Sequence, residues 1–196
     1  MSVDVQFQYI SKIKDAVGLN PSLIICSGAA YGDNNYQHIF PDAKILNVDM
    51  DPGEGVDCVW NLEEAPPEEL LKSCDLFIST SVLEHVKRPW LAANNITKTL
   101  KSYGILFITV PWAWEYHGFP SDYWRMSPEA LDTLFYETKV AHQTFVTYPD
   151  GWSYESLDDI PGIKGQYLSG LRDDGNKVKV RMHPLIQVFQ TRQLIQ

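Results

Sequence analysis

Short apolar runs rich in β-branched residues recur along the chain, and more polar segments separate them. Such runs are typical of strands that are buried on both faces of a parallel sheet. The run from Ile105 to Val110 shows this best, since Thr109 is its only polar residue. The pattern predicts seven strands, at Leu23–Ser27, Lys44–Asp49, Val56–Trp60, Asp75–Ser79, Gly104–Val110, Val140–Tyr148 and Leu185–Arg192.

Helical segments alternate with these strands. The first has apolar residues at helical spacing from Val5 to Val17, and Gly18 is a stop signal. Another has a good start, because Ser127 is a favourable cap and Pro128 suits the first helical position. We expect helices at Val3–Val17, Asn34–Ile39, Glu68–Leu71, Trp90–Lys101 and Pro128–Tyr136. The alternation predicts an α/β, Rossmann-like fold with a mostly parallel seven-stranded sheet and helices on both faces.

The chain has 196 residues, which is enough for one domain with a substantial core. We expect a single domain over residues 1–196, with an N-terminal helix at 3–17, a core over about 20–140, and late strands with a long loop over 140–196. Residues Gly151–Asn176 are polar and contain glycines, which predicts a long excursion between two late strands.

The composition limits the class of protein, its compartment and its partners. A hydrophobic content of 44% fits a soluble globular protein, and the longest nearly unbroken apolar run, Ile105–Trp114, is too short to span a membrane. The N-terminus lacks the layout of a signal peptide. The scattered Cys26, Cys58 and Cys74 favour buried thiols in a reducing cytoplasm over a disulfide or zinc site. A net charge of −9 without a basic stripe argues against a nucleic-acid partner.

The end of the first strand, in LIICSGAAYGD, is a candidate ligand turn. The apolar run stops at Ser27 and Gly28, where small residues follow. A nucleotide-binding turn usually has an acidic residue in the strand and about three glycines after it. Here Ile24 stands where the acid would be, and only Gly28 and Gly32 are glycines. These residues by themselves leave both a cofactor loop and an ordinary turn open.

The end of the second strand, in ILNVDMDPGEG, carries Asp49 and Asp51. In an open α/β sheet, ligands bind beyond the carboxyl ends of the strands, and an acid there can accept hydrogen bonds from both hydroxyls of a ribose. Asp51 with the following Pro-Gly is also an ordinary turn sequence. We therefore favour a binding role for Asp49 and a turn role for Asp51.

The sequence CDLFISTSVLEHVKRPWLAANNITKTLKSYGILFITVPW, which begins at Cys74, resembles the class I S-adenosylmethionine-dependent methyltransferases, in particular the type 11 group. The features that correspond are, in order, the strand Asp75–Ser79, the VLEHV segment, LKSYG in place of LKPGG, and a strand that ends in Val-Pro. The following YHGFPSDYWRMSPEAL is similar to the HG-x-P-x-DY-x-R segment of many members. The resemblance covers about residues 20–140, and implies the class I fold, with an antiparallel last strand, and S-adenosylmethionine as cofactor.

The resemblance also implies which residues bind the cofactor: Ser27, Gly28, Ala29, Asp49, Met50, Asn61, Leu62, Ser79 and Thr80. Asp49 would hold the ribose and Met50 would pack on the adenine, with Asn61 near its amino group. Against the LDIGCGxG pattern, the first loop departs at Ile24, Cys26, Ser27 and Ala30. Only DPGEG separates the second and third strands, so we expect an adenine side more open than in the family.

The segment PWAWEYHGFPSDYWR, after the fifth strand, holds the candidates for chemistry on the methyl acceptor. Methyl transfer needs a general base only if the nucleophile must lose a proton, and His117 is the best base by its intrinsic pKa. The expected substrate residues are Trp112, Trp114, Tyr116, Asp122, Tyr123 and Arg125. The aromatic residues would line a pocket for a sugar ring or flat heterocycle, Asp122 would orient His117 or bind substrate, and Arg125 would hold an anionic group, unless it only pairs with Asp122.

His85 belongs to the LEHV segment that the family shares, and we favour a structural role for it over proton transfer. Glu84 is expected at the solvated start of a helix. The five histidines, at positions 38, 85, 117, 142 and 183, follow no metal-ligand spacing, so we expect no metal site.

Three hypotheses follow. The leading one is a cytoplasmic methyltransferase that acts on a small molecule or a glycan precursor, with no membrane partner. The alternative is a non-catalytic module of the same fold that binds S-adenosylmethionine or a related nucleoside, since the first loop departs from the family pattern. A nicotinamide-dependent reductase is disfavoured, because none of the ten tyrosines has a lysine four residues later.

Overall fold

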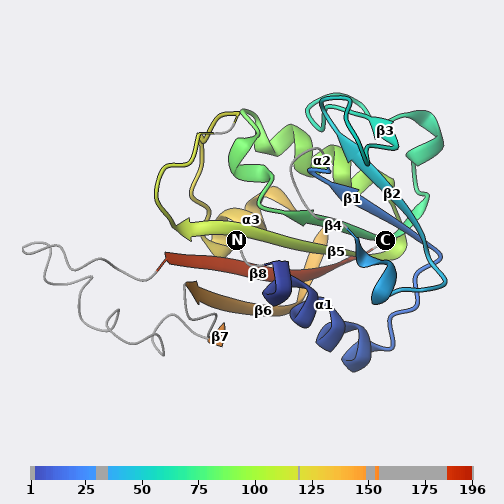
Figure 1. The fold of residues 1–196 in the computed structure, drawn as a ribbon, viewed down its shortest axis with the longest axis horizontal. Helices are drawn as coiled ribbons and strands as arrows, with labels where there is room; N and C mark the ends of the chain where they lie inside the picture. Colours follow the sequence, from blue (N-terminus) through green and yellow to red (C-terminus); the bar gives the residue numbers. More distant parts are fainter. Residues whose placement is uncertain (1–2, 30–34, 119, 149–152, 155–184, 196) are drawn as a thin grey trace, which may run out of the picture.

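The computed structural model describes residues 3–29, 35–118, 120–148, 153–154 and 185–195. These residues form one sheet with helices on both faces (Figure 1). The strands are β1 (Leu23–Ser27), β2 (Lys44–Asp49), β3 (Cys58–Val59), β4 (Cys74–Thr80), β5 (Leu100–Ala113), β6 (Thr138–Tyr148), β7 (Ser153–Tyr154) and β8 (Leu185–Leu194). The helices are α1 (Val3–Val17), α2 (Pro89–Thr99) and α3 (Pro128–Leu134), with short 3-10 helices η1 (Tyr36–His38), η2 (Glu68–Leu70) and η3 (Leu83–His85).

The strand order is β3-β2-β1-β4-β5-β8-β6-β7. The five strands from β3 to β5 pair in parallel, whereas β8 pairs antiparallel with both β5 and β6. The expected mostly parallel sheet with an antiparallel last strand is therefore confirmed. The two-residue β7, paired antiparallel with β6, adds an edge strand that the sequence did not predict.

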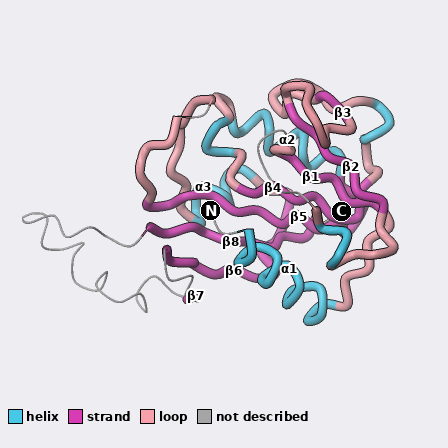
Figure 2. The backbone as a smooth tube through the Cα atoms, viewed as in Figure 1, coloured by secondary structure: helices cyan, strands magenta, loops and turns pink. Residues whose placement is uncertain are grey.

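Alternate residues of the central strands supply two separate cores. Ile25 of β1 and Leu106 of β5 belong to the core that packs under α2 and α3. Their neighbours in sequence, Ile24 and Phe107, belong to the core on the other face, which packs under α1. Figure 2 shows the helices on the two sides of the sheet. This alternation follows from the two-residue period of a strand, and each fully buried aliphatic side chain contributes about 1.5–3 kcal/mol.

Several element boundaries differ from the expectation. Lys101 was expected to end a helix, but α2 ends at Thr99 and β5 begins at Leu100. The reason is tertiary, because Leu100 pairs with Cys74 of β4 and joins the ladder of the sheet. The third strand is shorter than predicted, and the predicted helices at Asn34–Ile39 and Glu68–Leu71 are only the 3-10 turns η1 and η2. Residue 34 and most of Gly151–Asn176 lie outside the described residues.

The three cysteines are free thiols. Cys26 and Cys74 are buried as expected, and burial raises the pKa of the Cys74 thiol to about 12. Cys58 is partly exposed on the short strand β3. Of the helices in the described part of the chain, none has both the length and the apolar character needed to cross a lipid bilayer.

Asp75 ties the amino ends of three adjacent strands together. Its Oδ2 accepts hydrogen bonds from the backbone N–H groups of Ser22 (2.9 Å) and Leu23 (3.0 Å), at the start of β1, and from the Ser22 hydroxyl. Its Oδ1 accepts one from Nζ of Lys101 on β5, at 2.8 Å. Partial burial acts to raise the pKa of Asp75, but the bonds from Lys101 and Ser22 outweigh it and hold the pKa at about 2.

We predict that Asp75→Asn lowers the free energy of unfolding by about 1 kcal/mol at neutral pH, a figure discounted for the partial exposure of the carboxylate. The folded-state pKa of about 2 lies below the unfolded value of about 4. The stabilisation is therefore present above pH about 4 and is lost as the pH falls toward about 2. Urea unfolding curves of the parent and the variant should differ at neutral pH and converge in acid.

The control is Lys101→Met, which leaves all three bonds to Oδ2 in place and should cost less than Asp75→Asn. A difference between the parent and Asp75→Asn that stays constant across the acid range would show that the carboxylate charge contributes nothing.

Candidate functional site

The carboxyl ends of β1, β2 and β4 lie side by side in the sheet. The register pairs Ser27 with Val48 on one side and with Ser79 on the other. In an open parallel sheet, this edge is where ligands bind. The fold thus brings to one edge seven residues expected at a cofactor site: Ser27, Gly28, Ala29, Asp49, Met50, Ser79 and Thr80.

Asp49 ends β2 as a nearly buried acid, with 7% of its surface exposed. Its Oδ1 accepts a hydrogen bond from the backbone N–H of Asp51 at 3.1 Å, and its carbonyl accepts one from the backbone N–H of Trp60 at 2.7 Å. Asp51 itself is exposed, in agreement with a turn role. The backbone on both sides therefore holds the Asp49 carboxylate at the ligand edge of the sheet.

Gly28 makes the turn after β1 possible. Its φ of +81° lies in the left-handed region, and its N–H donates to the carbonyl of Val48 at 3.1 Å. A Cβ at this position would come within 2.7 Å of Cγ2 of Val82, a residue after β4. The turn thus needs glycine for its conformation and for its close approach to the neighbouring loop. Ala30 lies outside the described residues.

The residue after β4 is also held in an unusual conformation. Ser81 has a φ of +53°, and its N–H donates to the carbonyl of Thr109 on β5 at 3.0 Å. Strained backbone of this kind costs about 1–3 kcal/mol and gathers at binding sites. In the same strand, the hydroxyl of Ser79 is buried and has no hydrogen-bond partner. Thr80, one residue later, is partly exposed at the edge.

A cavity of about 460 Å³ opens beside the ends of β2 and β3. Its lining includes Met50, which is 54% exposed, and Asn61. No helix lies between β2 and β3, as the short DPGEG link predicted. Oδ1 of Asn61 accepts a hydrogen bond from the backbone N–H of Glu63 at 3.0 Å, which leaves that oxygen one further lone pair. Leu62, in contrast, is buried in the core.

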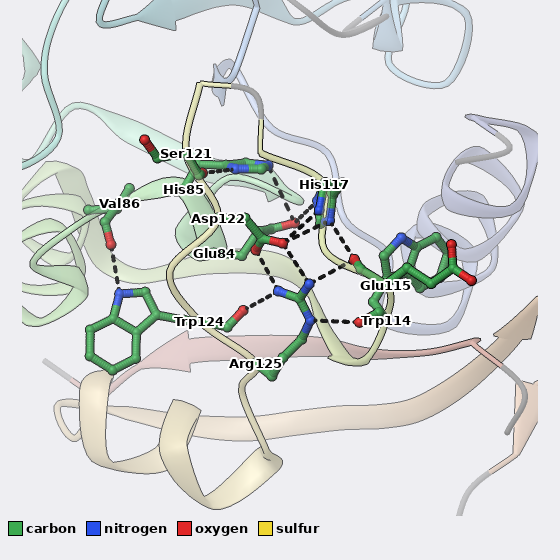
Figure 3. A network of polar contacts seen from close by, with 10 residues as sticks. All are labelled: Glu84, His85, Val86, Trp114, Glu115, His117, Ser121, Asp122, Trp124 and Arg125. Carbon is green, nitrogen blue, oxygen red and sulfur yellow. Dashed lines mark hydrogen bonds and ion pairs between the residues drawn. The ribbon is translucent and has the colours of Figure 1, made fainter. Parts of the chain in front are cut away.

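The segment after β5 folds back onto η3 and the residue that follows it (Figure 3). The backbone N–H of Tyr123 donates to the carbonyl of Glu84 at 2.8 Å, and Nε1 of Trp124 donates to the carbonyl of Val86 at 2.9 Å. Nδ1 of His85 bonds to the carbonyl of Ser121. His85 thus has the structural role that we favoured for it, because it joins the connection after β4 to the segment after β5.

Asp122 and Arg125 form a two-bond ion pair, with nitrogen–oxygen distances of 2.5 and 2.6 Å. The remaining donors of the guanidinium bond to the carbonyls of Trp114, Glu115 and Trp124. All five N–H groups of Arg125 are therefore engaged within the protein. The structure thus shows Arg125 paired with Asp122, which the sequence left open beside a role in holding an anionic group.

His117 lies between two acidic side chains. Its backbone N–H donates to Oδ2 of Asp122 at 2.9 Å, and its Nε2 is 3.8 Å from Oε1 of Glu84. The Glu84 carboxylate is the main cause that raises the pKa of His117. The pKa of Asp122 is lowered, first by its hydrogen bonds from Arg125. Asp122 therefore positions the backbone of His117. To orient His117 was one of the two roles expected for Asp122, and to bind substrate was the other.

The expected aromatic residues divide into two groups. Trp112 and Trp114 are partly buried and pack against the two cores. Tyr116 and Tyr123 are exposed, by 78% and 49%. The first pair therefore closes the core at the end of β5, and the second pair is free to meet a ligand.

The expectation for Glu84 was wrong. Its side chain is fully buried, and neither carboxylate oxygen has a hydrogen-bond partner. Its Oε1 lies 4.0 Å from Nε2 of His85 and 3.8 Å from Nε2 of His117. His85 and His117 therefore lie close together, although the five histidines follow no metal-ligand spacing in the sequence. Spacing could not reveal this cluster, because its members come from two separate segments. The acid next to the histidine in LEHV was the one available signal.

No family model matches the sequence, and no curated protein matches it. Solved structures do match. The 1,6-didemethyltoxoflavin-N1-methyltransferase of Burkholderia thailandensis, with bound 1,6-didemethyltoxoflavin and S-adenosylhomocysteine, has a TM-score of 0.65 at 11% identity, over 97% of this chain and 78% of that chain. The N-methyltransferase NodS of Bradyrhizobium japonicum, in complex with S-adenosylhomocysteine, has a TM-score of 0.56 at 12% identity, over 97% of this chain and 85% of that chain.

The [4+2]-cyclase SpnF matches as well, with a TM-score of 0.58 at 12% identity, over 95% of this chain and 82% of that chain. At such identities the likeness shows the fold. The chain has the class I methyltransferase fold, as the sequence led us to expect.

We predict that Gly28→Ala lowers the free energy of unfolding by about 2 kcal/mol or more, measured by urea denaturation. The left-handed backbone and the crowding against Val82 both contribute. Gly55 is a matched control, because it has the same φ of +81° but open space around a new Cβ. Gly55→Ala should therefore cost only the backbone strain, about 1 kcal/mol.

The difference between the two variants isolates the contact with Val82. Adding Val82→Ala to Gly28→Ala should recover part of the loss. Equal costs for Gly28→Ala and Gly55→Ala would show that the two loops do not touch in solution.

Proposed function

We propose that this protein is an S-adenosylmethionine-dependent methyltransferase that acts on a small-molecule or saccharide acceptor in the cytoplasm. The observation that carries the proposal is the buried Asp49 carboxylate at the end of β2, beside the Gly28 turn of β1. In a sheet of this topology, these two positions lie where a nucleoside ligand binds.

The residues at this edge fit the proposed cofactor. Asp49 supplies a fixed carboxylate for the ribose hydroxyls, and the cavity bordered by Met50 and Asn61 supplies room on the adenine side. Gly28 has no Cβ, and a Cβ at this position would collide with Val82. The unpartnered hydroxyl of Ser79 supplies a further polar group. The departures from the family pattern in β1, at Ile24, Cys26 and Ser27, therefore leave Gly28 and Asp49 in place.

S-adenosylmethionine, when bound, supplies an activated methyl group that a nucleophile displaces directly. The protein must then orient the acceptor and exclude water. The segment after β5 is suited to this task, because Asp122 and Arg125 hold it in place against η3. His117 lies on this segment and faces Glu84, so an acceptor proton would be handled at this end of the site.

The alternative is a module that binds S-adenosylmethionine or a related nucleoside and does not catalyse methyl transfer. It is favoured by Ile24, which is fully buried in β1 where the family has an acid. The cyclase SpnF shares the fold, so the fold alone does not require methyl transfer. Incubation with isotopically labelled S-adenosylmethionine and a panel of small alcohols, phenols, amines and sugars separates the two. Binding without transfer to any of these acceptors would favour the module.

We predict that Asp49→Ala weakens the binding of S-adenosylhomocysteine about ten- to a hundredfold, measured by isothermal titration calorimetry. This is the scale of a hydrogen bond to a charged group, about 1.5–3 kcal/mol. Thermal unfolding of the free variant checks that the loss is local.

Asp51→Ala is the matched control, because Asp51 is exposed two residues further along the same turn. Its affinity should stay within about threefold of the parent. If Asp51→Ala abolishes binding while Asp49→Ala does not, the ribose acid is Asp51. If both variants bind as the parent does, the cofactor site lies elsewhere.

A further inference from the structure

Glu84, His85 and His117 form a cluster between η3 and the segment after β5. One ligand-type atom from each residue lies within 4.8 Å of the other two. Glu84 is fully buried, and both of its oxygens lack a hydrogen-bond partner. A buried carboxylate without a partner is costly, so a positive group is needed to face it.

The two imidazoles present the same edge to this carboxylate (Figure 3). Nδ1 of His85 bonds to the carbonyl of Ser121, and Nδ1 of His117 lies 3.1 Å from the carbonyl of Glu115. Because a carbonyl oxygen only accepts, Nδ1 carries the proton in both rings. In the neutral rings, Nε2 therefore has its lone pair free, at 4.0 Å from Oε1 of Glu84 for His85 and at 3.8 Å for His117.

This arrangement has the features of a metal site with its supporting contacts. A histidine that binds a metal nearly always donates its other ring N–H to a carbonyl or a carboxylate, which fixes the tautomer and the ring orientation. Both histidines do so here. His117 has a second support, because Oδ2 of Asp122 lies 3.3 Å from its Nδ1. The two rings are nearly perpendicular, at 85°, and their centroids lie 5.0 Å apart.

We propose that Glu84, His85 and His117 bind a divalent transition-metal ion of the Zn²⁺ type. Two imidazole nitrogens favour such an ion over Mg²⁺ or Ca²⁺, which prefer oxygen ligands throughout. Ligand atoms about 2.1 Å from a tetrahedral ion lie about 3.4 Å apart. The observed separations of 3.8 and 4.0 Å reach this value with shifts of about half an ångström.

Two histidines and one carboxylate leave a coordination position open, as in catalytic zinc sites. A metal in this site would hold an acceptor hydroxyl in that position and lower its pKa, so the hydroxyl would lose its proton to solvent water before its oxygen takes the methyl group from the sulfonium. This role rests on the proposed methyltransferase function, whereas metal binding itself does not.

The test is a titration of the full-length protein, stripped with a chelator, with Zn²⁺ in a calorimeter without cofactor. We expect one equivalent to bind and to raise the midpoint of thermal unfolding. Glu84→Gln keeps the shape of the side chain and removes the charge, and His117→Ala alters a ring that is 37% exposed. Each should weaken Zn²⁺ binding at least about a hundredfold. The visible absorption of bound Co²⁺ should show the same dependence on these residues.

His38→Ala is the matched control, because His38 is an exposed histidine on η1 and should leave Zn²⁺ binding unchanged. The proposal is overturned if Glu84→Gln and His117→Ala bind Zn²⁺ as the parent does, if His38→Ala loses as much affinity, or if Mg²⁺ binds as tightly as Zn²⁺. A parent that binds no Zn²⁺ also overturns it, and leaves Glu84 neutralised by protonated His117. Because S-adenosylhomocysteine binding is measured separately, either proposal can fail while the other stands.

Discussion

The ion pair between Asp122 and Arg125 holds the segment after β5 together. The Asp122 side chain is 1% exposed, and the guanidinium of Arg125 uses all five of its donors inside the loop. The same carboxylate accepts the backbone N–H of His117. The position of His117 beside Glu84 therefore depends on this pair. Breaking the pair would leave a buried carboxylate uncompensated, which costs far more than the pair itself gains.

The strand β1 is held at both ends by contacts that differ in kind. At its amino end, the Asp75 carboxylate accepts hydrogen bonds from the backbone N–H groups of Ser22 and Leu23, so the strand starts at a defined residue. At its carboxyl end, Gly28 permits a left-handed turn that meets Val82 at close range. The strand is thus fixed by hydrogen bonds at its amino end and by close packing at its carboxyl end, where the candidate ligand edge lies.

Much of the fold could be predicted because its signals are local. The apolar run from Ile105 to Val110 lies within β5, and α1 ends before Gly18, as its spacing indicated. The errors came where pairing between distant residues decides the outcome. Leu100 continues a helical segment in sequence, yet it pairs with Cys74 and starts a strand. The short β7 depends on β6 in the same way, because two residues carry no pattern of their own.

The same distinction between local signals and contacts of distant residues applies to the candidate site. The positions of Asp49 and Gly28 at one edge of the sheet could be predicted from the sequence, because each comes at the end of an apolar strand and the carboxyl ends of parallel strands share one edge. Glu84 could not, since a charged residue beside a turn is normally solvated, and only the segment around Asp122 that folds over η3 removes it from water. The periodicity of a strand or helix depends on residues that are neighbours in the sequence. Burial of a charge, and the meeting of His85 with His117, depend on how separate segments pack, and only the tertiary structure decides them.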